Sequence, residues 1–244
     1  MEHLDTSTGR RIAYHRTAGK GPWVVFLGGF KSDMNGTKAV HLEGWARSAG
    51  QAFLRFDYSG HGASSETFEA GSIGDWAEDA VEAIKTLTEG PVVLVGSSMG
   101  GWISLLVARR IDRVVGLVGI AAAPDFTEDS MWAGFDEAQR AELADIGRIN
   151  LPSDYGEPYL ITRRLIENGR ENLVLRDPVT PFGPVRLLQG TADADVSRDT
   201  ALRLLDHLEG DVRLTFVKGA DHRFSDDACL KLIERTVEEV LACV

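Results

Sequence analysis

The sequence predicts an α/β fold, with a mostly parallel sheet that is covered by helices on both faces. Short apolar runs alternate with amphipathic stretches along the chain, which is typical of parallel strands that are each followed by a helix. The chain has 244 residues, of which 43% are hydrophobic, so it can bury the core of one such domain without a second domain. We therefore expect a single domain over residues 1–244.

Seven apolar runs have the length of strands and are followed by turn residues or amphipathic stretches. In chain order, the expected strands are residues 11–15, 24–28, 52–57, 92–96, 114–121, 185–190 and 213–218. Between them, apolar residues recur every three or four positions, which indicates helices. The expected helices are residues 38–49, 76–88, 101–110, 199–208 and 226–242.

Residues 125–181 interrupt this alternation, because they contain no convincing strand and many large apolar side chains. These are Met131, Trp132, Phe135, Leu143, Ile146, Leu151, Tyr155, Tyr159, Leu160, Leu165 and Ile166. A structureless loop of this length is uncommon in a compact domain, so we expect a folded helical cap insertion. The alternative is a set of ordinary helices packed on the side of the sheet. We further expect Trp132 and Phe135 to roof a pocket that binds an acyl chain.

The motif Gly96-Ser97-Ser98-Met99-Gly100 lies between an expected strand and an expected helix. A direct turn from strand to helix strains its central residue and requires glycine two positions before and after it, where side chains would collide with neighbouring elements. Such a turn lifts the Ser98 hydroxyl above the sheet edge. It also points the first amides of the helix, including that of Met99, at the place where an oxyanion would form. The context favours Ser98 as a nucleophile over a merely structural turn.

A serine nucleophile needs a base, and the base needs an acid that fixes its tautomer. His207 falls inside an expected amphipathic helix, whereas His222 follows the last expected strand, on a loop at the sheet edge where chemistry is usually placed. We therefore predict His222 as the base. The acid is expected after the preceding strand, where both Asp193 and Asp195 are available. Asp195 is the alternative acid, but its position before the following helix favours an exposed turn or N-cap residue.

A second oxyanion donor is expected from the amide that follows the glycine pair at residues 28–29. This amide belongs to Phe30, which would act together with Met99. Both residues would use their backbone, so their side chains are free to shape the pocket.

Two other polar segments favour structural interpretations. Asp57 and His61 precede the serine, and the glycines around His61 indicate a tight turn. Asn35 or Thr37 is expected to cap the helix that starts near Lys38. The alternative is that Asn35 or Lys38 contacts a polar group of the substrate near the oxyanion hole.

Four longer segments carry a more specific resemblance: Gly29–Ala39, Arg55–Gly60, Leu94–Trp102 and Asp221–Arg223. With the three loops above, they place the chain, by resemblance, in the α/β-hydrolase superfamily. Within it, the chain is similar nearly end to end, and least in the cap, to the mitochondrial abhydrolase-domain palmitoyl-protein thioesterases, also described as mycophenolic acid acyl-glucuronide esterases.

The resemblance implies the α/β-hydrolase fold and a catalytic triad of Ser98, Asp193 and His222. The spacing from Gly190 through Asp193 to Val196 is similar to the acid loop of the superfamily, which favours Asp193 over Asp195. Ser197 departs from the family, which often has proline after the acid loop.

The formal net charge of −11 argues against nucleic acid or an anionic membrane surface as a partner. Cys229 and Cys243 suggest neither a disulfide framework nor a metal site. Residues 1–8 lack the pattern of a signal or transit peptide, and no run of 18 apolar residues occurs. We expect a cytoplasmic protein that needs no cofactor and no metal and does not insert into a membrane.

These observations predict a serine hydrolase that cleaves a carboxylic ester or acyl thioester through an acyl-enzyme. The partner would be a small-molecule ester or thioester, with acylated proteins as further candidates. The alternative chemistry is a C–C bond hydrolase or peptidase on the same triad, since fold and triad do not fix the substrate. A non-catalytic binding module is the alternative of a different class, but such a module would be expected to lose a triad residue.

Overall fold

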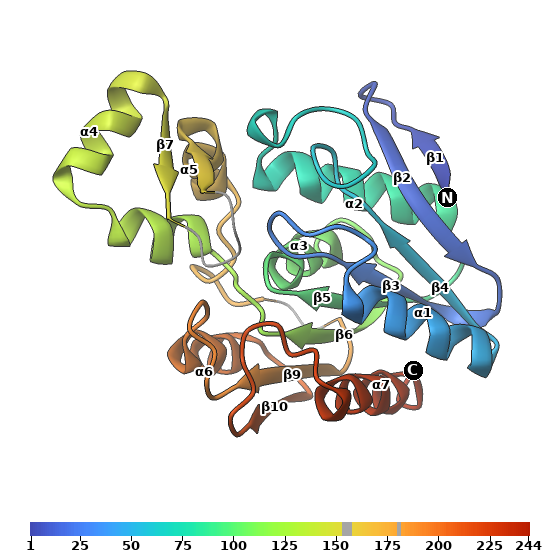
Figure 1. Cartoon of the computed structure of the whole chain (residues 1–244). Coiled ribbons are helices and arrows are strands. Elements are labelled where there is room, and N and C mark those ends of the chain that lie inside the picture. The colour runs from blue at the N-terminus through green and yellow to red at the C-terminus, as the bar shows by residue number, and fades with distance from the viewer. Residues whose placement is uncertain (153–157, 180–181) are drawn as a thin grey trace.

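The structure is a computed structural model that describes residues 1–152, 158–179 and 182–244. Within these ranges, eight strands form one sheet with the order β1-β2-β4-β3-β5-β6-β9-β10 (Figure 1). They are β1 (Glu2–Asp5), β2 (Arg11–Thr17), β3 (Lys20–Leu27), β4 (Gln51–Phe56), β5 (Val92–Ser97), β6 (Val114–Ile120), β9 (Val185–Gly190) and β10 (Val212–Val217). From β4 to β10 all neighbours are parallel, whereas β1 and β2 pair antiparallel at one edge.

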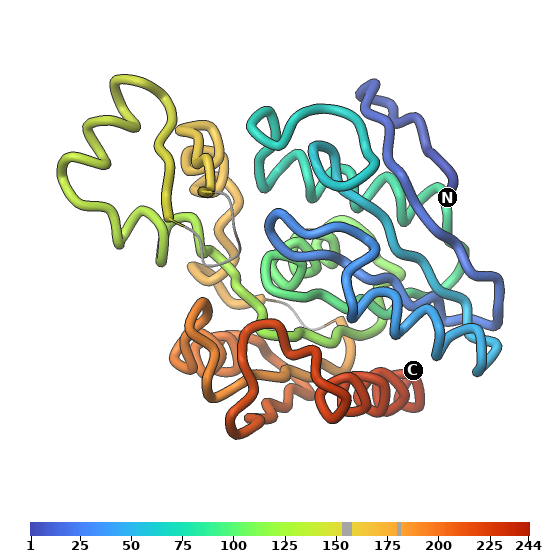
Figure 2. The backbone as a smooth tube through the Cα atoms, viewed as in Figure 1, coloured from blue at the N-terminus to red at the C-terminus, as the bar shows by residue number. Residues whose placement is uncertain are grey.

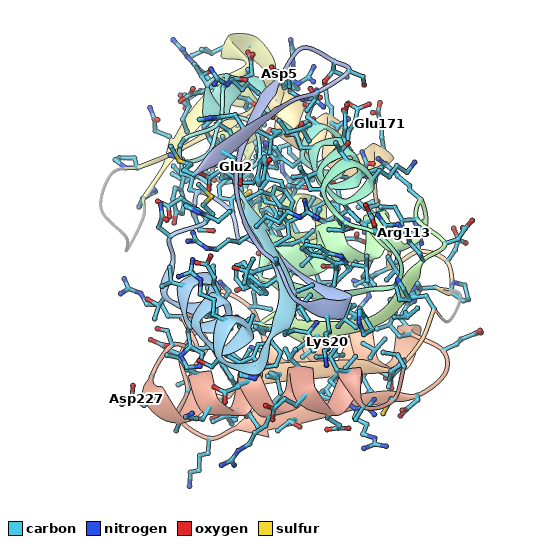
Figure 3. The ribbon with its side chains drawn as sticks, turned by 90° about the vertical axis from the view of Figure 1, so that its right-hand side faces the viewer. Glu2, Asp5, Lys20, Arg113, Glu171 and Asp227 are labelled. Carbon is cyan, nitrogen blue, oxygen red and sulfur yellow. The ribbon has the colours of Figure 1, made fainter. Side chains whose placement is uncertain are left out.

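Helices cover both faces of this sheet, which confirms the expected fold class. The helices are α1 (Thr37–Ala49), α2 (Ile73–Leu87), α3 (Met99–Ala108), α4 (Glu137–Ile146), α5 (Arg163–Glu171), α6 (Arg198–His207) and α7 (Asp227–Leu241), with a short 3₁₀ turn at Phe68–Ala70. Strand residues alternate between two apolar clusters: Val24 packs with residues of α1 and α7, and Val25 packs with residues of α2, α3 and α6. Viewed from the side, side chains fill the space between these layers (Figure 3).

The seven expected strands and five expected helices are all present, with small shifts at their ends. The largest shift is in β3, which begins at Lys20 instead of Val24. The sequence pattern missed β1, because three of its four residues are polar and exposed and only Leu4 is apolar.

The described residues between β6 and β9, which we call the cap segment or cap, lie beside the sheet (Figure 2). It contains a π-helical turn (Thr127–Trp132), α4, β7 (Arg148–Leu151), β8 (Tyr159–Thr162) and α5. The expectation that this segment holds no strand is therefore wrong. The antiparallel pair β7–β8 places Ile149 opposite Ile161, both buried, but strands of four residues are too short to give a clear periodic signal. Tyr155 and residue 181, the end of the range expected for the cap, lie outside the described residues.

The cap packs directly on the helix that follows the serine turn. Trp102 of α3 donates a hydrogen bond from Nε1 to the Asn172 carbonyl oxygen at 3.0 Å. Its ring also meets the Phe126 ring edge to face, with centroids 5.6 Å apart. The cap is thereby fixed against the element that positions Ser98.

Candidate active site

Ser98 lies at the turn between β5 and α3, with φ 54° and ψ −119°. Positive φ is unfavourable for a residue with a side chain and persists only where the surroundings impose it. They do so here: a Cβ at Gly96 would lie 2.4 Å from the Gly100 carbonyl oxygen, and a Cβ at Gly100 would lie 2.0 Å from that of Leu27. The Ser98 amide donates to the Ile120 carbonyl oxygen at 2.9 Å. Close packing of β3, β5 and α3 thus holds the strained turn.

The acid loop after β9 and the histidine loop after β10 are tied together by their backbones. The Ala192 amide donates to the Ala220 carbonyl oxygen at 3.0 Å, and the Gly219 amide donates to Thr191 Oγ1 at 2.9 Å. A Cβ at Gly190 would lie 2.2 Å from the same Ala220 oxygen, so glycine is required for this approach. Two segments about thirty residues apart therefore meet at the carboxyl edge of the sheet.

Ser98, His222 and Asp193 form one hydrogen-bonded chain. His222 Nε2 is 3.1 Å from Ser98 Oγ, and His222 Nδ1 is 2.9 Å from Asp193 Oδ2. Because a carboxylate only accepts, it fixes the proton of neutral His222 on Nδ1 and leaves Nε2 free to accept from the serine hydroxyl. The His222 side chain is 19% exposed and that of Asp193 is fully buried. The geometry is that required for a nucleophile, a base and an orienting acid.

Three further donors hold the Asp193 carboxylate. Oδ2 accepts from Gln189 Nε2 at 2.9 Å, while Oδ1 accepts from the amides of Val196 at 2.8 Å and Asp195 at 2.9 Å. Burial would raise the pKa of Asp193, but the hydrogen bonds from His222 and the Val196 amide outweigh it and place this pKa below its ordinary value. Asp193 is therefore the ionised partner that a charged histidine needs.

Sequence reasoning missed Gln189, which donates to Asp193 from within β9. Its signal is present in the sequence: it is an uncharged polar residue in a strand whose six residues are all buried. A buried amide requires hydrogen-bond partners, so this position marks a neighbour of a polar site.

Asp195 is neither the acid nor the N-cap; it lies exposed in the bend between β9 and α6, in agreement with the expectation of an exposed turn. The carboxylate that accepts from His222 Nδ1 belongs to Asp193, and the N-cap of α6 is Ser197, whose Oγ accepts from the Thr200 amide at 3.2 Å. Ser197, where relatives often have proline, thus has a local structural role.

Ligand atoms of Asp193, Asp195 and His222 lie within 4.8 Å of one another, which is close enough to suggest a cation site. However, the two oxygens of Asp193 already accept four hydrogen bonds, and a carboxylate has only about four lone pairs that can accept. A metal ion would have to displace His222 or the backbone amides. The donor set fits a catalytic dyad better than a metal centre.

The two expected oxyanion donors flank Ser98. Met99 is the first residue of α3, so its amide has no acceptor within the helix. Phe30 follows Gly29, where a Cβ would lie only 3.3 Å from Ser98 Cβ, so the loop runs directly beside the serine. The Phe30 ring packs edge to face on Phe126 and Tyr159, with centroids 5.6 and 5.7 Å away.

A cavity of about 440 Å³ opens beside Ser98 and His222, within the range of ~300–1,000 Å³ of small-molecule sites. Its apolar wall includes Phe30 from the core and Phe126, Met131 and Tyr159 from the cap segment.

The structure does not place Trp132 or Phe135 at this cavity. Their rings pack on each other with centroids 6.0 Å apart, and the guanidinium groups of Arg140 and Arg170 lie 5.1 and 4.4 Å from the Trp132 ring. Trp132 is thus held within the cap by cation–π contacts. The expectation that Trp132 and Phe135 roof the pocket is therefore wrong. Met131 and Tyr159 line the cavity instead, because adjacent residues of the turn at Thr127–Trp132 point to different sides, so that Met131 reaches the cavity and Trp132 does not.

Asp57 and His61 have structural surroundings, in agreement with the sequence interpretation. Asp57 is buried and accepts from the amides of Met34 at 2.6 Å and Ala63 at 2.8 Å. His61 is buried against the Trp76 ring, and burial lowers its pKa to about 4. His61 is therefore neutral and packs as an aromatic side chain.

The expectation that Asn35 or Thr37 caps α1 is wrong. The N-cap is Gly36, with no side-chain hydrogen bond, and Asn35 Oδ1 accepts instead from Arg55 at 3.1 Å. Lys38, in the first turn of α1, lines the cavity and donates from Nζ to the Arg223 carbonyl oxygen.

Comparison with known proteins identifies the family. Residues 24–235 match the alpha/beta hydrolase family. The chain is 36% identical over 234 residues to the palmitoyl-protein thioesterase ABHD10, mitochondrial, of Rattus norvegicus, covering 94% of this chain and 78% of the relative. For the human protein of the same name the identity is 35%, covering 94% and 76%.

Solved structures agree. Alpha/beta hydrolase domain-containing protein 10 from mouse superposes with a TM-score of 0.91 at 34% identity, covering 99% of this chain and 98% of the other. A protein from Agrobacterium vitis S4 superposes with a TM-score of 0.95 at 38% identity, covering 98% of both chains. In the described part of this chain, no helix is both long and apolar enough to cross a bilayer. Given the match over residues 24–235 and the shared architecture, this chain belongs to the alpha/beta hydrolase family.

Proposed function

We propose that this protein is a serine hydrolase that cleaves carboxylic esters or acyl thioesters through an acyl-enzyme. The observation that carries the proposal is the hydrogen-bonded chain from Ser98 Oγ through His222 to Asp193, which opens into a largely apolar cavity. Relatives that align over 94% of this chain are named palmitoyl-protein thioesterases, which supports acyl thioesters as a substrate class.

In the first half of the reaction, His222 Nε2 accepts the hydroxyl proton as Ser98 Oγ attacks the acyl carbon. The amides of Phe30 and Met99 donate to the oxyanion of the tetrahedral intermediate. When the intermediate collapses, the carbon–oxygen or carbon–sulfur bond to the leaving group breaks, and His222 returns the proton to that group. Buried Asp193 stabilises the imidazolium form between these steps.

In the second half, water takes the place of the leaving group. His222 accepts a proton from water as its oxygen attacks the acyl carbon of the ester on Ser98. Collapse of this second intermediate releases the carboxylic acid and returns the proton to Ser98. Thioesters suit this site because a thiolate leaves with little need for protonation, while the oxyanion donors contact only the carbonyl oxygen.

The acyl chain is assigned to the cavity wall formed by Phe30, Phe126, Met131 and Tyr159. The rat and human relatives carry the word mitochondrial in their names, and a cytoplasmic location for this chain stays a prediction. Small-molecule thioesters and acylated proteins both remain candidate substrates.

The proposal is tested with Ser98→Ala and the neighbouring Ser97→Ala, assayed by fluorophosphonate labelling and by hydrolysis of butyryl thioesters. Loss of the nucleophile costs on the order of 10⁶ in kcat in comparable hydrolases, so Ser98→Ala should lose both activities. Ser97→Ala should retain labelling, because Ser97 belongs to β5 and lies outside the triad. Labelling that persists in Ser98→Ala would refute the assignment.

A further inference from the structure

The catalytic cavity is lined by three cationic side chains and by the two carboxylates of Asp33 and Asp195, although the whole chain has a net charge of −11. Lys31 and Lys38 come from the segment after β3, and Arg223 directly follows His222. Cations gathered at the active site of an acidic protein need a local explanation.

Lys38 is the cation most closely associated with the catalytic loop. Its ammonium group donates to the Arg223 carbonyl oxygen, one residue after the catalytic histidine. An ammonium group has three N–H donors, so two remain for other acceptors. In the described ranges, no carboxylate oxygen lies within the 4.0 Å of an ion pair with Lys38.

Burial of this amine works against its charge. It lowers the pKa of Lys38 to about 8, while Asp221 raises it and Arg223 lowers it through longer-range interactions. The group still carries its proton at pH 7, without a paired carboxylate to offset its desolvation. A partly buried charge of this kind is stabilised by an anion that enters the cavity.

The mechanism defines which side of the cavity Lys38 occupies. His222 Nε2 delivers its proton to the leaving group, so the leaving group must lie against the histidine loop. Lys38 is bonded to that loop. The apolar residues Phe126, Met131 and Tyr159 come from the cap segment and suit the acyl chain.

We propose that Lys38 binds a carboxylate on the leaving group of the substrate and thereby sets a preference for acidic leaving groups. The inference rests on the proposed hydrolase function. Gly36, Thr37 and Ala39 line the same cavity, and the N-terminus of α1 has neither a side-chain cap nor an acidic residue in its first turn. Its partial positive charge adds to that of the ammonium group.

The test compares butyryl thioesters of para-nitrothiophenol and of its ring-carboxylated analogue, so the two substrates differ by one carboxylate. The measured quantity is kcat/KM for the acidic substrate divided by kcat/KM for the neutral one. Lys38→Met should lower this ratio about ten-fold or more, because a hydrogen bond to a charged group is lost, and the change should appear mainly in KM. Lys38→Arg, which keeps the charge, should retain most of the preference.

Lys31→Met is the matched control. The Lys31 ammonium group lies over the Phe68 and Tyr159 rings, 5.1 and 5.2 Å from their centroids, and is bound there by cation–π attraction. Its removal should change the ratio much less than Lys38→Met. An equal fall would indicate a general electrostatic field and would overturn the assignment of a site at Lys38.

The wild-type ratio should also fall as the pH rises through about 8, where Lys38 loses its proton. The charged and titratable groups around it are Asp221, His222 and Arg223 on the histidine loop and Cys229 on α7. The ratio cancels effects on the shared catalytic steps, because both substrates use the same base.

Two results separate the failure of this inference from that of the proposed function. If Lys38→Met slows both thioesters equally, Lys38 only holds the histidine loop, and the anion site is refuted while the hydrolase remains. If the wild type cleaves neither substrate, the hydrolase proposal fails. Calorimetric binding of the unreactive butyl thioether analogues then tests the anion site at Lys38. Tighter binding of the acidic analogue than of the neutral one, lost in Lys38→Met, supports the site. Equal binding of the two analogues to the wild type overturns it.

Discussion

Replacing Asp193 by asparagine keeps the volume of the side chain but changes the donors and acceptors around His222. In the structure, all four neighbours of the carboxylate are donors: the amides of Asp195 and Val196 at Oδ1, and Gln189 Nε2 and His222 Nδ1 at Oδ2. An asparagine offers one accepting oxygen and one donating NH₂ group. With the oxygen kept on the two backbone amides, the NH₂ group faces His222 Nδ1.

His222 can then avoid a clash of donors only by moving its proton to Nε2. In that tautomer Nε2 donates and can no longer accept the proton of Ser98. The same tautomer change in another serine hydrolase costs about 10⁴ in kcat, and we expect about 10³ to 10⁴ here. At 1.36 kcal/mol per factor of ten, this is about 4–5.5 kcal/mol of lost transition-state stabilisation. Steady-state hydrolysis of nitrophenyl butyrate measures it, with circular dichroism to check folding.

Asp195→Asn is the matched control, because Asp195 contributes its backbone amide to the acid and not the carboxylate that holds His222. It should lose far less activity than Asp193→Asn. If the ranking is reversed, Asp195 is the acid and the geometric argument fails. If Asp193→Asn stays within ten-fold of wild type, the tautomer argument fails.

Two further predictions follow from the cavity and from a buried ion pair. Met131→Ala should flatten the rise of kcat/KM from acetyl to octanoyl esters, since each buried methylene contributes about 0.8 kcal/mol. Trp132→Ala is the control, because Trp132 lies in the cap outside the cavity. A larger effect from Trp132→Ala than from Met131→Ala would contradict the assignment. Glu43→Ala should lower the free energy of unfolding in urea by about 3–5 kcal/mol, because it leaves the buried Arg55 guanidinium unpaired. Arg47→Ala removes only the exposed partner of Glu43 and should cost less than about 1 kcal/mol. Burial alone would raise the pKa of Glu43, but Arg55 holds it below the ordinary value. The stability that the Glu43–Arg55 pair contributes is therefore present near neutral pH and is lost as the pH falls through the lowered pKa. Equal losses of unfolding free energy in Glu43→Ala and Arg47→Ala would refute this account.

Local patterns in the sequence were sufficient for most of the sheet and for singling out Ser98 and His222, whereas the choice of Asp193 over Asp195 came from the resemblance to the acid loop of the superfamily. The strand before Ser98 is a continuous buried run, and the helix after it is buried along nearly its whole length. The glycines on either side of Ser98 indicate a tight turn, and the structure shows that turn with a positive φ at Ser98. His222 was identified because it follows a strand directly, and such positions gather at one edge of a parallel sheet.

The cavity wall was not predictable in the same way. Trp132 and Met131 are adjacent and both apolar, but only the packing of the Thr127–Trp132 turn decides that Met131 faces the cavity. Gln189 and Lys38 act through partners far away in the sequence. A single sequence gives no direct signal for such tertiary contacts.

The cap also serves as the connection between parallel strands β6 and β9, which pair side by side in the sheet. Parallel neighbours cannot be joined by a tight turn, so the chain must travel from one end of the sheet to the other between them. A deletion of this segment would therefore remove more than the wall of the acyl pocket. It would detach β9 and β10, and with them the loops bearing Asp193 and His222, from the half of the sheet that carries Ser98. Exchange of the cap between relatives must preserve this span, which restricts how substrate range can change by recombination.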